Sequence, residues 1–118
     1  MSTRALSISA HGALEILAAP AIMVAPFVFD FGQAATVITV TLGALLLGLA
    51  LQLEGPRRTV PLSAHAGFDY GLAFVALIGG LAVGLGTGEW AAGVFLVGVG
   101  VALMALSAST RFTAARGA

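Results

Sequence analysis

The sequence contains no cysteine, which excludes disulfides, thiolate metal sites and cysteine nucleophiles. Charge is also scarce, because only 8% of the 118 residues are charged, whereas a soluble globular domain carries about 25%. Five acidic and five basic side chains are too few to cover the surface of a water-soluble fold of this length. Since hydrophobic residues make up 59% of the chain and fall in long runs, the composition predicts an integral membrane protein.

Lysine is absent too, so every basic residue is an arginine, and the formal net charge is zero. Arg57 and Arg58 form the only adjacent basic pair, which predicts no binding to nucleic acid. The length leaves room for one membrane domain, residues 1–118, because no stretch outside the apolar runs is long enough to bury a core of its own.

The apolar runs predict four transmembrane helices, since a helix needs about 20 apolar residues to cross the hydrocarbon core. Transmembrane strands would instead alternate apolar and polar residues, whereas residues 42–51 are apolar on every face. The expected fold class is therefore an all-α membrane protein. The predicted helices cover residues 10–29, 34–53, 66–86 and 90–108.

The arginines predict the orientation of these helices. With four spans, the N-terminus, the middle loop and the C-terminus share one side of the membrane, and every arginine falls on that side. The opposite side receives Asp30 and Glu89, and Trp90 stands at its boundary. The excess of basic residues in cytoplasmic loops predicts cytoplasmic termini and a location in the cytoplasmic (inner) membrane.

The two halves of the chain resemble each other, which predicts two parallel-repeat helical hairpins. Residues 11–15, His-Gly-Ala-Leu-Glu, match residues 65–69, His-Ala-Gly-Phe-Asp, position by position. After one inserted residue, Gly43 falls against Gly98. The first repeat would cover about 11–53 and the second about 65–109.

The end of the first predicted helix carries a family resemblance. Ala25-Pro26-Phe27 resembles the Ser-Pro-Trp signature of the SPW-repeat family, small bacterial membrane proteins built from two-helix repeats. The proline is kept, whereas alanine replaces the serine and phenylalanine replaces the tryptophan. The second half has Gly79-Gly80-Leu81 at the equivalent place. The resemblance implies a helical repeat architecture and no particular biochemical activity.

Glycine and proline give expectations for helix packing. Small residues let membrane helices approach closely, and a run of them at four-residue spacing follows one face of the third predicted helix. Proline removes an amide donor and kinks a helix, which predicts kinks at Pro20 and Pro26 in the first helix. The glycines expected to pack helices are Gly67, Gly71, Gly80, Gly84 and Gly88.

Two histidine–carboxylate pairs are the candidate functional residues. His11 with Glu15, and His65 with Asp69, stand one helical turn apart and so share a face. Glu15 lies about 7 Å inside its span at 1.5 Å per residue, shallow enough to reach water or to pair with His11, Arg57 or Arg58. The cluster is therefore expected to anchor helix ends, and a proton or cation pathway stays open, because intramembrane ionisable groups are often functional.

The two histidines could face each other and ligate a metal or haem, but without supporting ligands they predict no metal and no cofactor site. No catalytic constellation is visible, and the chain is expected not to be an enzyme. We expect a structural or interaction subunit of the cytoplasmic membrane that contacts lipid and either its own copies or another membrane protein. The alternative is a small oligomeric transporter or channel for protons, cations or a small solute that uses Glu15 and Asp69.

Overall fold

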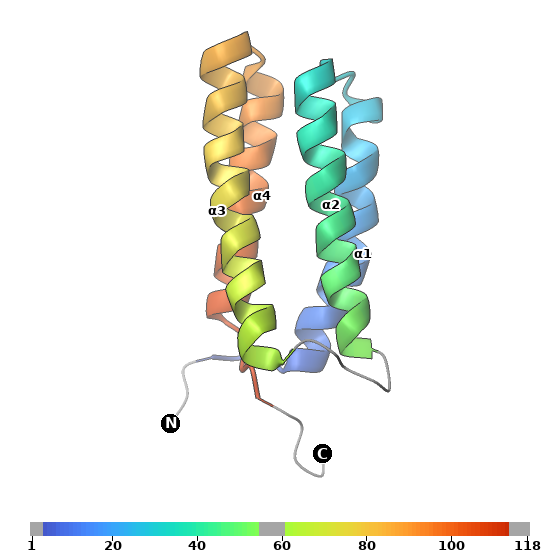
Figure 1. Ribbon diagram of the computed structural model, residues 1–118, viewed down its shortest axis with the longest axis vertical. Coiled ribbons are helices and arrows are strands. Elements are labelled where there is room, and N and C mark those ends of the chain that lie inside the picture. The colour runs from blue at the N-terminus through green and yellow to red at the C-terminus, as the bar shows by residue number, and fades with distance from the viewer. Residues whose placement is uncertain (1–3, 55–60, 114–118) are drawn as a thin grey trace.

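The computed structural model describes residues 4–54 and 61–113, and within these ranges the chain forms four helices (Figure 1). Three of the predicted spans agree with the observed helices to within two residues at each end. The third helix begins four residues earlier than predicted, directly after Pro61, whose φ of −59° suits the start of a helix. The helices are α1, Ile8–Val28; α2, Gln33–Glu54; α3, Leu62–Thr87; and α4, Trp90–Ala108.

All four helices are long and apolar enough to cross a membrane, with 19 to 26 residues each. Large apolar side chains cover the outside of the bundle: Leu17, Phe27 and Leu85 are each more than 70% exposed. A soluble protein rarely exposes contiguous apolar surface on this scale, whereas lipid tails solvate it. The fold therefore indicates a multi-pass membrane protein.

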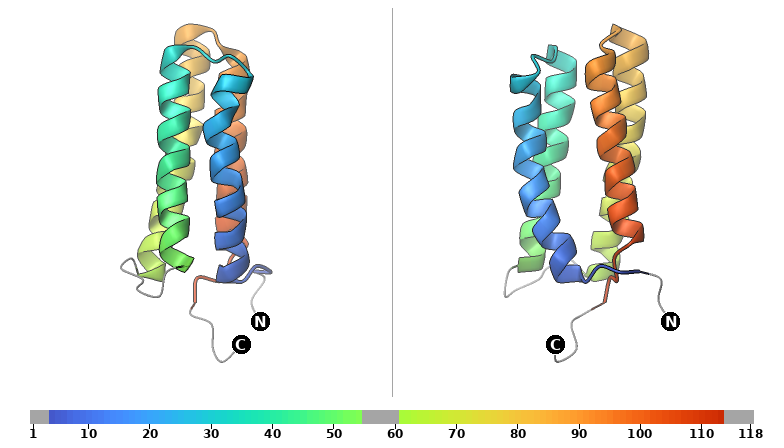
Figure 2. Two further views of the ribbon diagram at one scale, coloured as in Figure 1. Left: turned by 90° about the vertical axis from the view of Figure 1, so that its right-hand side faces the viewer. Right: turned by 180° about the vertical axis from the view of Figure 1, so that it is seen from behind.

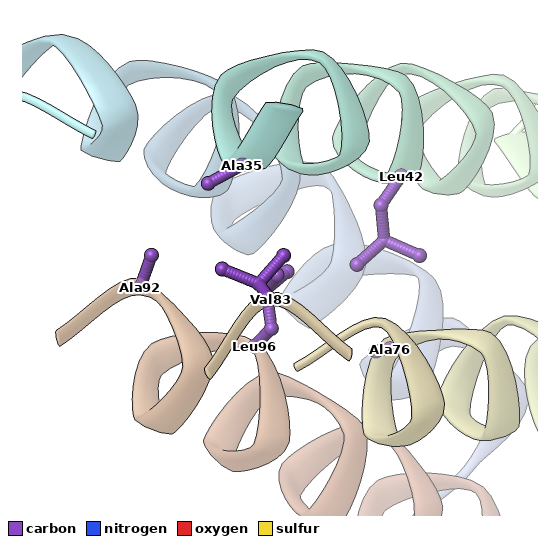
Figure 3. Packing of buried hydrophobic residues seen from close by; sticks show 6 residues of the cluster. All are labelled: Ala35, Leu42, Ala76, Val83, Ala92 and Leu96. Atoms are coloured by element: carbon purple, nitrogen blue, oxygen red, sulfur yellow. The ribbon is translucent and has the colours of Figure 1, made fainter. Parts of the chain in front are cut away.

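The helices pack as two antiparallel pairs, α1 with α2 and α3 with α4, which lie side by side (Figures 1 and 2). Small and branched apolar side chains fill the space where α2 meets the second pair (Figure 3). The helix backbones approach one another more closely within each pair than between the pairs, so these side chains bridge the wider gap. The cluster consists of Ala35, Leu42, Ala76, Val83, Ala92 and Leu96.

Only part of the predicted glycine face packs against a helix. A Cβ on Gly80 would lie 2.6 Å from the carbonyl oxygen of Gly93, and a Cβ on Gly84 would overlap the ring of Trp90. By contrast, Gly67 and Gly71 have no atom within 4 Å of their Cβ positions, so these two do not pack against another helix of the same bundle. Gly88 ends α3 with φ +75°, a left-handed cap rather than a packing contact.

Gly43 and Gly100 occupy similar positions in the two pairs. A Cβ on Gly43 would lie 3.1 Å from the carbonyl oxygen of Ala19, and one on Gly100 would lie 2.8 Å from that of Ala73. Gly98, which the sequence alignment paired with Gly43, has nothing within 4 Å. The second pair has three more residues than the first between the histidine and this glycine, rather than one, because α3 runs further past its histidine than α1 does while the connection to α4 is shorter.

The prolines do not break α1, which runs continuously from Ile8 to Val28 through Pro20 and Pro26. Past the second proline, the Phe29 N–H still donates to the Ala25 carbonyl, as in a regular α-helix, at 2.9 Å. The Phe31 N–H then donates to the Pro26 carbonyl, also at 2.9 Å, and with Asp30 at φ 55° this closes the helix as a Schellman motif does. Membrane helices accept internal proline when neighbouring groups satisfy the freed backbone.

Both ends of the bundle are tied together. At one end, the Gly32 N–H in the α1–α2 connection donates to Glu89 Oε1 in the α3–α4 connection, at 2.7 Å. At the other end, Leu6 and Thr110 form an isolated parallel bridge between the segments that flank α1 and α4. Residues far apart in the chain thus close each end of the four-helix bundle.

Candidate functional site

Two histidines and two carboxylates meet between α1 and α3. His11 and Glu15 lie one turn apart in the first half of α1, and His65 and Asp69 do the same in α3, so each pair shares a face. Both histidines are the fourth residue of their helix, which places the pairs at equal depth. All four side chains have zero exposure, and each offers one possible ligand atom within 4.8 Å of the others. We call these four residues the His–carboxylate centre.

Each histidine contacts both carboxylates. Between helices, His11 Nε2 lies 2.7 Å from Asp69 Oδ2, and His65 Nε2 lies 3.2 Å from Glu15 Oε1. Within each helix, His11 Nε2 lies 3.0 Å from Glu15 Oε2, and His65 Nε2 lies 3.0 Å from Asp69 Oδ2. The contacts therefore cross from one helix pair to the other and join the two halves of the bundle.

Thr110 fixes the proton on one ring nitrogen of His11. Its hydroxyl lies 2.6 Å from the Leu106 carbonyl, to which it donates its only hydrogen. The same hydroxyl lies 2.9 Å from His11 Nδ1, so it must accept there, and Nδ1 carries the hydrogen. Consequently His11 Nε2 faces the two carboxylates with either a second proton or a free lone pair.

Two buried polar atoms of the centre, Asp69 Oδ1 and His65 Nδ1, have no hydrogen-bond partner among the described residues, and Glu15 Oε2 has only its 3.0 Å contact with His11 Nε2. A buried polar atom left unpaired costs about 1–3 kcal/mol. With neutral histidines and ionised carboxylates the centre has a formal charge of −2. Two protons or one divalent cation would neutralise this charge, so the centre favours the binding of positive charge.

The terminal segments cover the centre. The ring of Phe112 packs edge-on against the imidazole of His11, with centroids 5.1 Å apart, and lies 6.2 Å from that of His65. Arg111 turns away, because its guanidinium donates to the carbonyl of Arg4 at 3.0 Å. Phe112 therefore separates the histidines from the end of the bundle without bringing in a competing positive charge.

An apolar cavity of about 290 Å³ lies beside Glu15, between α1, α2 and α4. Leu46, Phe95 and Leu103 form part of its wall, and the exposed Ala18 is also part of it. Because an exposed residue lines it, the cavity reaches the lipid-facing side of the bundle. It brings apolar space next to one carboxylate of the centre.

The structure brings together all four residues that the sequence singled out, and the expected pairing of Glu15 with His11 is confirmed. Their expected access to water is not found, since none of the four is exposed. Arg57 and Arg58, the other expected partners of Glu15, lie outside the described residues.

Sequence reasoning missed the role of Thr110 and Phe112. It ended the fourth span at residue 108 and assigned no role to the residues after it, because nothing in a single sequence places a tail beside residues about 100 positions away. The only available signal was that a threonine and an aromatic residue directly follow the span.

No family model, curated protein or solved structure matches the chain. The candidate site therefore stands on its geometry alone.

Proposed function

We propose that the chain is a small protein of the cytoplasmic membrane that binds cations, either protons or a metal ion, at the His–carboxylate centre. One observation carries this proposal: two histidines and two carboxylates lie fully buried and in mutual contact inside a membrane bundle. Ionisable groups at membrane depth are costly and most often serve a function. We keep the expectation that the chain is not an enzyme.

Helix anchoring alone explains the centre poorly. Buried ion pairs contribute little net stability, because desolvation offsets their attraction, and apolar residues of similar size often do as well. A bundle that packs through alanine and glycine elsewhere has no need of four ionisable side chains to join α1 to α3. Asp69 Oδ1 and His65 Nδ1, which have no hydrogen-bond partner among the described residues, also argue against anchoring as the sole role. An arrangement selected for stability would pair such buried atoms.

A single copy is better suited to binding than to transport across the membrane. Beyond the centre, towards the Glu89 end, Thr39 is the one buried polar side chain among those described in the helices. An ion at the centre would therefore meet an apolar barrier inside the bundle. The alternative function, an oligomeric transporter or channel that uses Glu15 and Asp69, is favoured by the cavity beside Glu15, which gives access from the membrane side.

We also propose that the two helix pairs are copies of one repeat. Ala19 and Ala73, which pack against Gly43 and Gly100, are 54 positions apart, the same spacing as the two histidines. Membership of the SPW-repeat family rests on the Ala25-Pro26-Phe27 resemblance and is part of this proposal.

The membrane type and orientation come from the arginines. Arg4 and Arg111 lie together at the end of the bundle that carries the centre, and Glu89 lies at the opposite end. The positive-inside rule then places the centre near the cytoplasmic face of the inner membrane. Association with further copies or with another membrane protein stays a prediction.

The test compares the purified full-length protein with the Glu15→Gln, Asp69→Asn double variant. Thermal unfolding in mild detergent is followed from pH 5 to pH 8, with and without added divalent cations. We expect the melting temperature of the native protein to respond to pH or to a cation, and the double variant to lose this response while keeping its helix content. An unchanged response in the double variant would refute cation binding at the centre.

Glu89→Gln is the matched control, because it neutralises a carboxylate at the opposite end of the bundle. Its response to pH and cations should equal that of the native protein. Flux measured in proteoliposomes tests the alternative function: a transporter would move protons or cations in a way that the double variant abolishes.

A further inference from the structure

We propose that the His–carboxylate centre binds one divalent first-row transition-metal ion, of which Zn²⁺ is the representative. The ligands are Nε2 of His11, Nε2 of His65, and one carboxylate oxygen each from Glu15 and Asp69. This inference rests on the proposed function and specifies its cation. It follows from the spacing of the ligand atoms, the charge they carry, their chemical type and the hydrogen bond from His11 Nδ1 to Thr110.

The spacing of the ligand atoms is close to that of a metal site. In a tetrahedral site with metal–ligand bonds of about 2.0–2.1 Å, neighbouring ligand atoms lie about 3.4 Å apart. The four nitrogen–oxygen contacts of the centre measure 2.7 to 3.2 Å. His11 and His65 contact different oxygens of Glu15, so three of these contacts belong to one set of four ligand atoms, and all pairs in that set lie within 4.8 Å. To admit the ion, the contacting atoms must separate by a few tenths of an ångström and the Glu15 carboxylate must turn one oxygen towards both histidines, which side-chain torsions allow.

The charge balance favours a divalent ion. Two neutral imidazoles and two carboxylates carry a formal charge of −2, and a buried site in a membrane is stable only near neutrality. One divalent cation replaces two protons without changing the net charge. A monovalent metal ion would leave one negative charge, and a trivalent ion would leave one positive charge. Binding should therefore release two protons per metal ion when the centre starts out doubly protonated.

The donor types select among divalent ions. Imidazole nitrogen is a poor ligand for Mg²⁺ and Ca²⁺, which prefer six or more oxygen ligands. Two imidazoles with two carboxylates suit Zn²⁺, and to a lesser degree Fe²⁺, Co²⁺ and Mn²⁺. Because the chain has no cysteine, a soft thiolate site for Cu⁺ is excluded.

The hydrogen bond from His11 Nδ1 to Thr110 completes the fit. Metal-binding histidines almost always donate their second N–H to an oxygen, which fixes the ring and directs the other nitrogen's lone pair at the metal. Thr110 accepts that bond at 2.9 Å and is itself held by the Leu106 carbonyl. Thr110 is thus a positioning residue and does not touch the metal.

Cobalt titration tests the proposal, because tetrahedral Co²⁺ absorbs visible light whereas Zn²⁺ does not. The full-length protein, purified with a tag that contains no histidine and stripped with a chelator, is titrated with Co²⁺ in detergent. We expect one tetrahedral Co²⁺ per chain, displaced by one Zn²⁺, with about two protons released to the buffer. Elemental analysis after desalting gives an independent stoichiometry.

Three variants locate the site. The Glu15→Gln, Asp69→Asn variant should lose the cobalt spectrum, whereas Glu89→Gln should bind like the native protein. Thr110→Val keeps all four ligands, and its affinity should fall by about 10–100-fold, as losses of outer hydrogen bonds do. Helix content and a monodisperse elution profile verify that each variant is folded.

The outcomes separate this inference from the proposed function. If no cobalt or zinc binds while the pH response of stability persists, the metal inference fails and proton binding stands. If neither metal binding nor a pH response is found, both fail. Equal metal binding by the double variant would place the metal elsewhere in the chain and overturn the inference.

Discussion

Replacing the whole His–carboxylate centre by apolar residues should harm the fold less than removing one member of it. The quadruple variant is His11→Leu, Glu15→Met, His65→Leu, Asp69→Val, and the matched single variant is Asp69→Val. In the single variant, both imidazoles lose their contacts to Asp69 Oδ2, at 2.7 and 3.0 Å, and a charged group stays buried with fewer partners. In the quadruple variant no charge is left in the centre.

The magnitudes follow from the burial of all four side chains. Removing one partner of a buried ion pair costs about 3–5 kcal/mol, whereas exchanging the complete pair for apolar residues is neutral or stabilises by about 1–4 kcal/mol. Since a domain has only about 5–15 kcal/mol of stability, the single variant should be markedly easier to unfold. Thr110 adds no further cost in the quadruple variant, because its hydroxyl still donates to the Leu106 carbonyl.

The assay is unfolding in mixed micelles, followed by circular dichroism as the fraction of denaturing detergent rises. The quadruple variant should unfold at or above the detergent fraction of the native protein, and Asp69→Val well below it. If the quadruple variant unfolds as early as the single variant, or earlier, the centre contributes net stability. Stabilisation of the fold would then be enough to explain the centre, and a binding function would lose its main physical support.

Two further predictions concern helix packing and the end of the bundle that carries Glu89. Gly80→Ala should lower the unfolding free energy by about 1–3 kcal/mol, because the new Cβ meets the Gly93 carbonyl. Gly71→Ala, which meets nothing within 4 Å, should leave it unchanged or slightly raised, and the micelle assay compares the two. Glu89→Ala should weaken the fold by about 1 kcal/mol through loss of the bond to the Gly32 N–H. Hydrogen exchange at the Gly32 amide should then speed up by about fivefold, and an unchanged exchange rate would contradict this.

The helices were predictable from the sequence because hydropathy over about 20 residues depends only on local composition. The face that each helix turns inwards was not. The helices are apolar all round, so nothing in the pattern distinguished Gly80, which packs against α4, from Gly71, which does not. Which glycine faces a neighbouring helix depends on how two whole helices pack against each other.

The candidate site was predictable in its parts but not in its assembly. The one-turn spacing of His11 and Glu15 placed both on one face, and the matching residues in the second half placed them at equal depth. Their complete burial depends on side chains of α1 and α3 meeting across the bundle. It also depends on the segment after α4 folding back over the histidines, as the contact between His11 and Phe112 shows. The depth of Glu15 was counted in residues along its own helix, and such a count cannot include a distant segment that covers the helix end. The sequence therefore placed Glu15 within reach of water.

The division of the centre between two helix pairs has a consequence for how such a chain could arise. Each pair supplies one imidazole and one carboxylate, so an ancestral polypeptide half as long would have built the whole centre only by dimerising around a twofold axis. Duplication and fusion would then have freed the copies to diverge. On the proposed duplication, the glutamate in one half and the aspartate at the equivalent place in the other would be such a divergence. Thr110 supports His11, while the Nδ1 atom of His65 has no partner among the described residues.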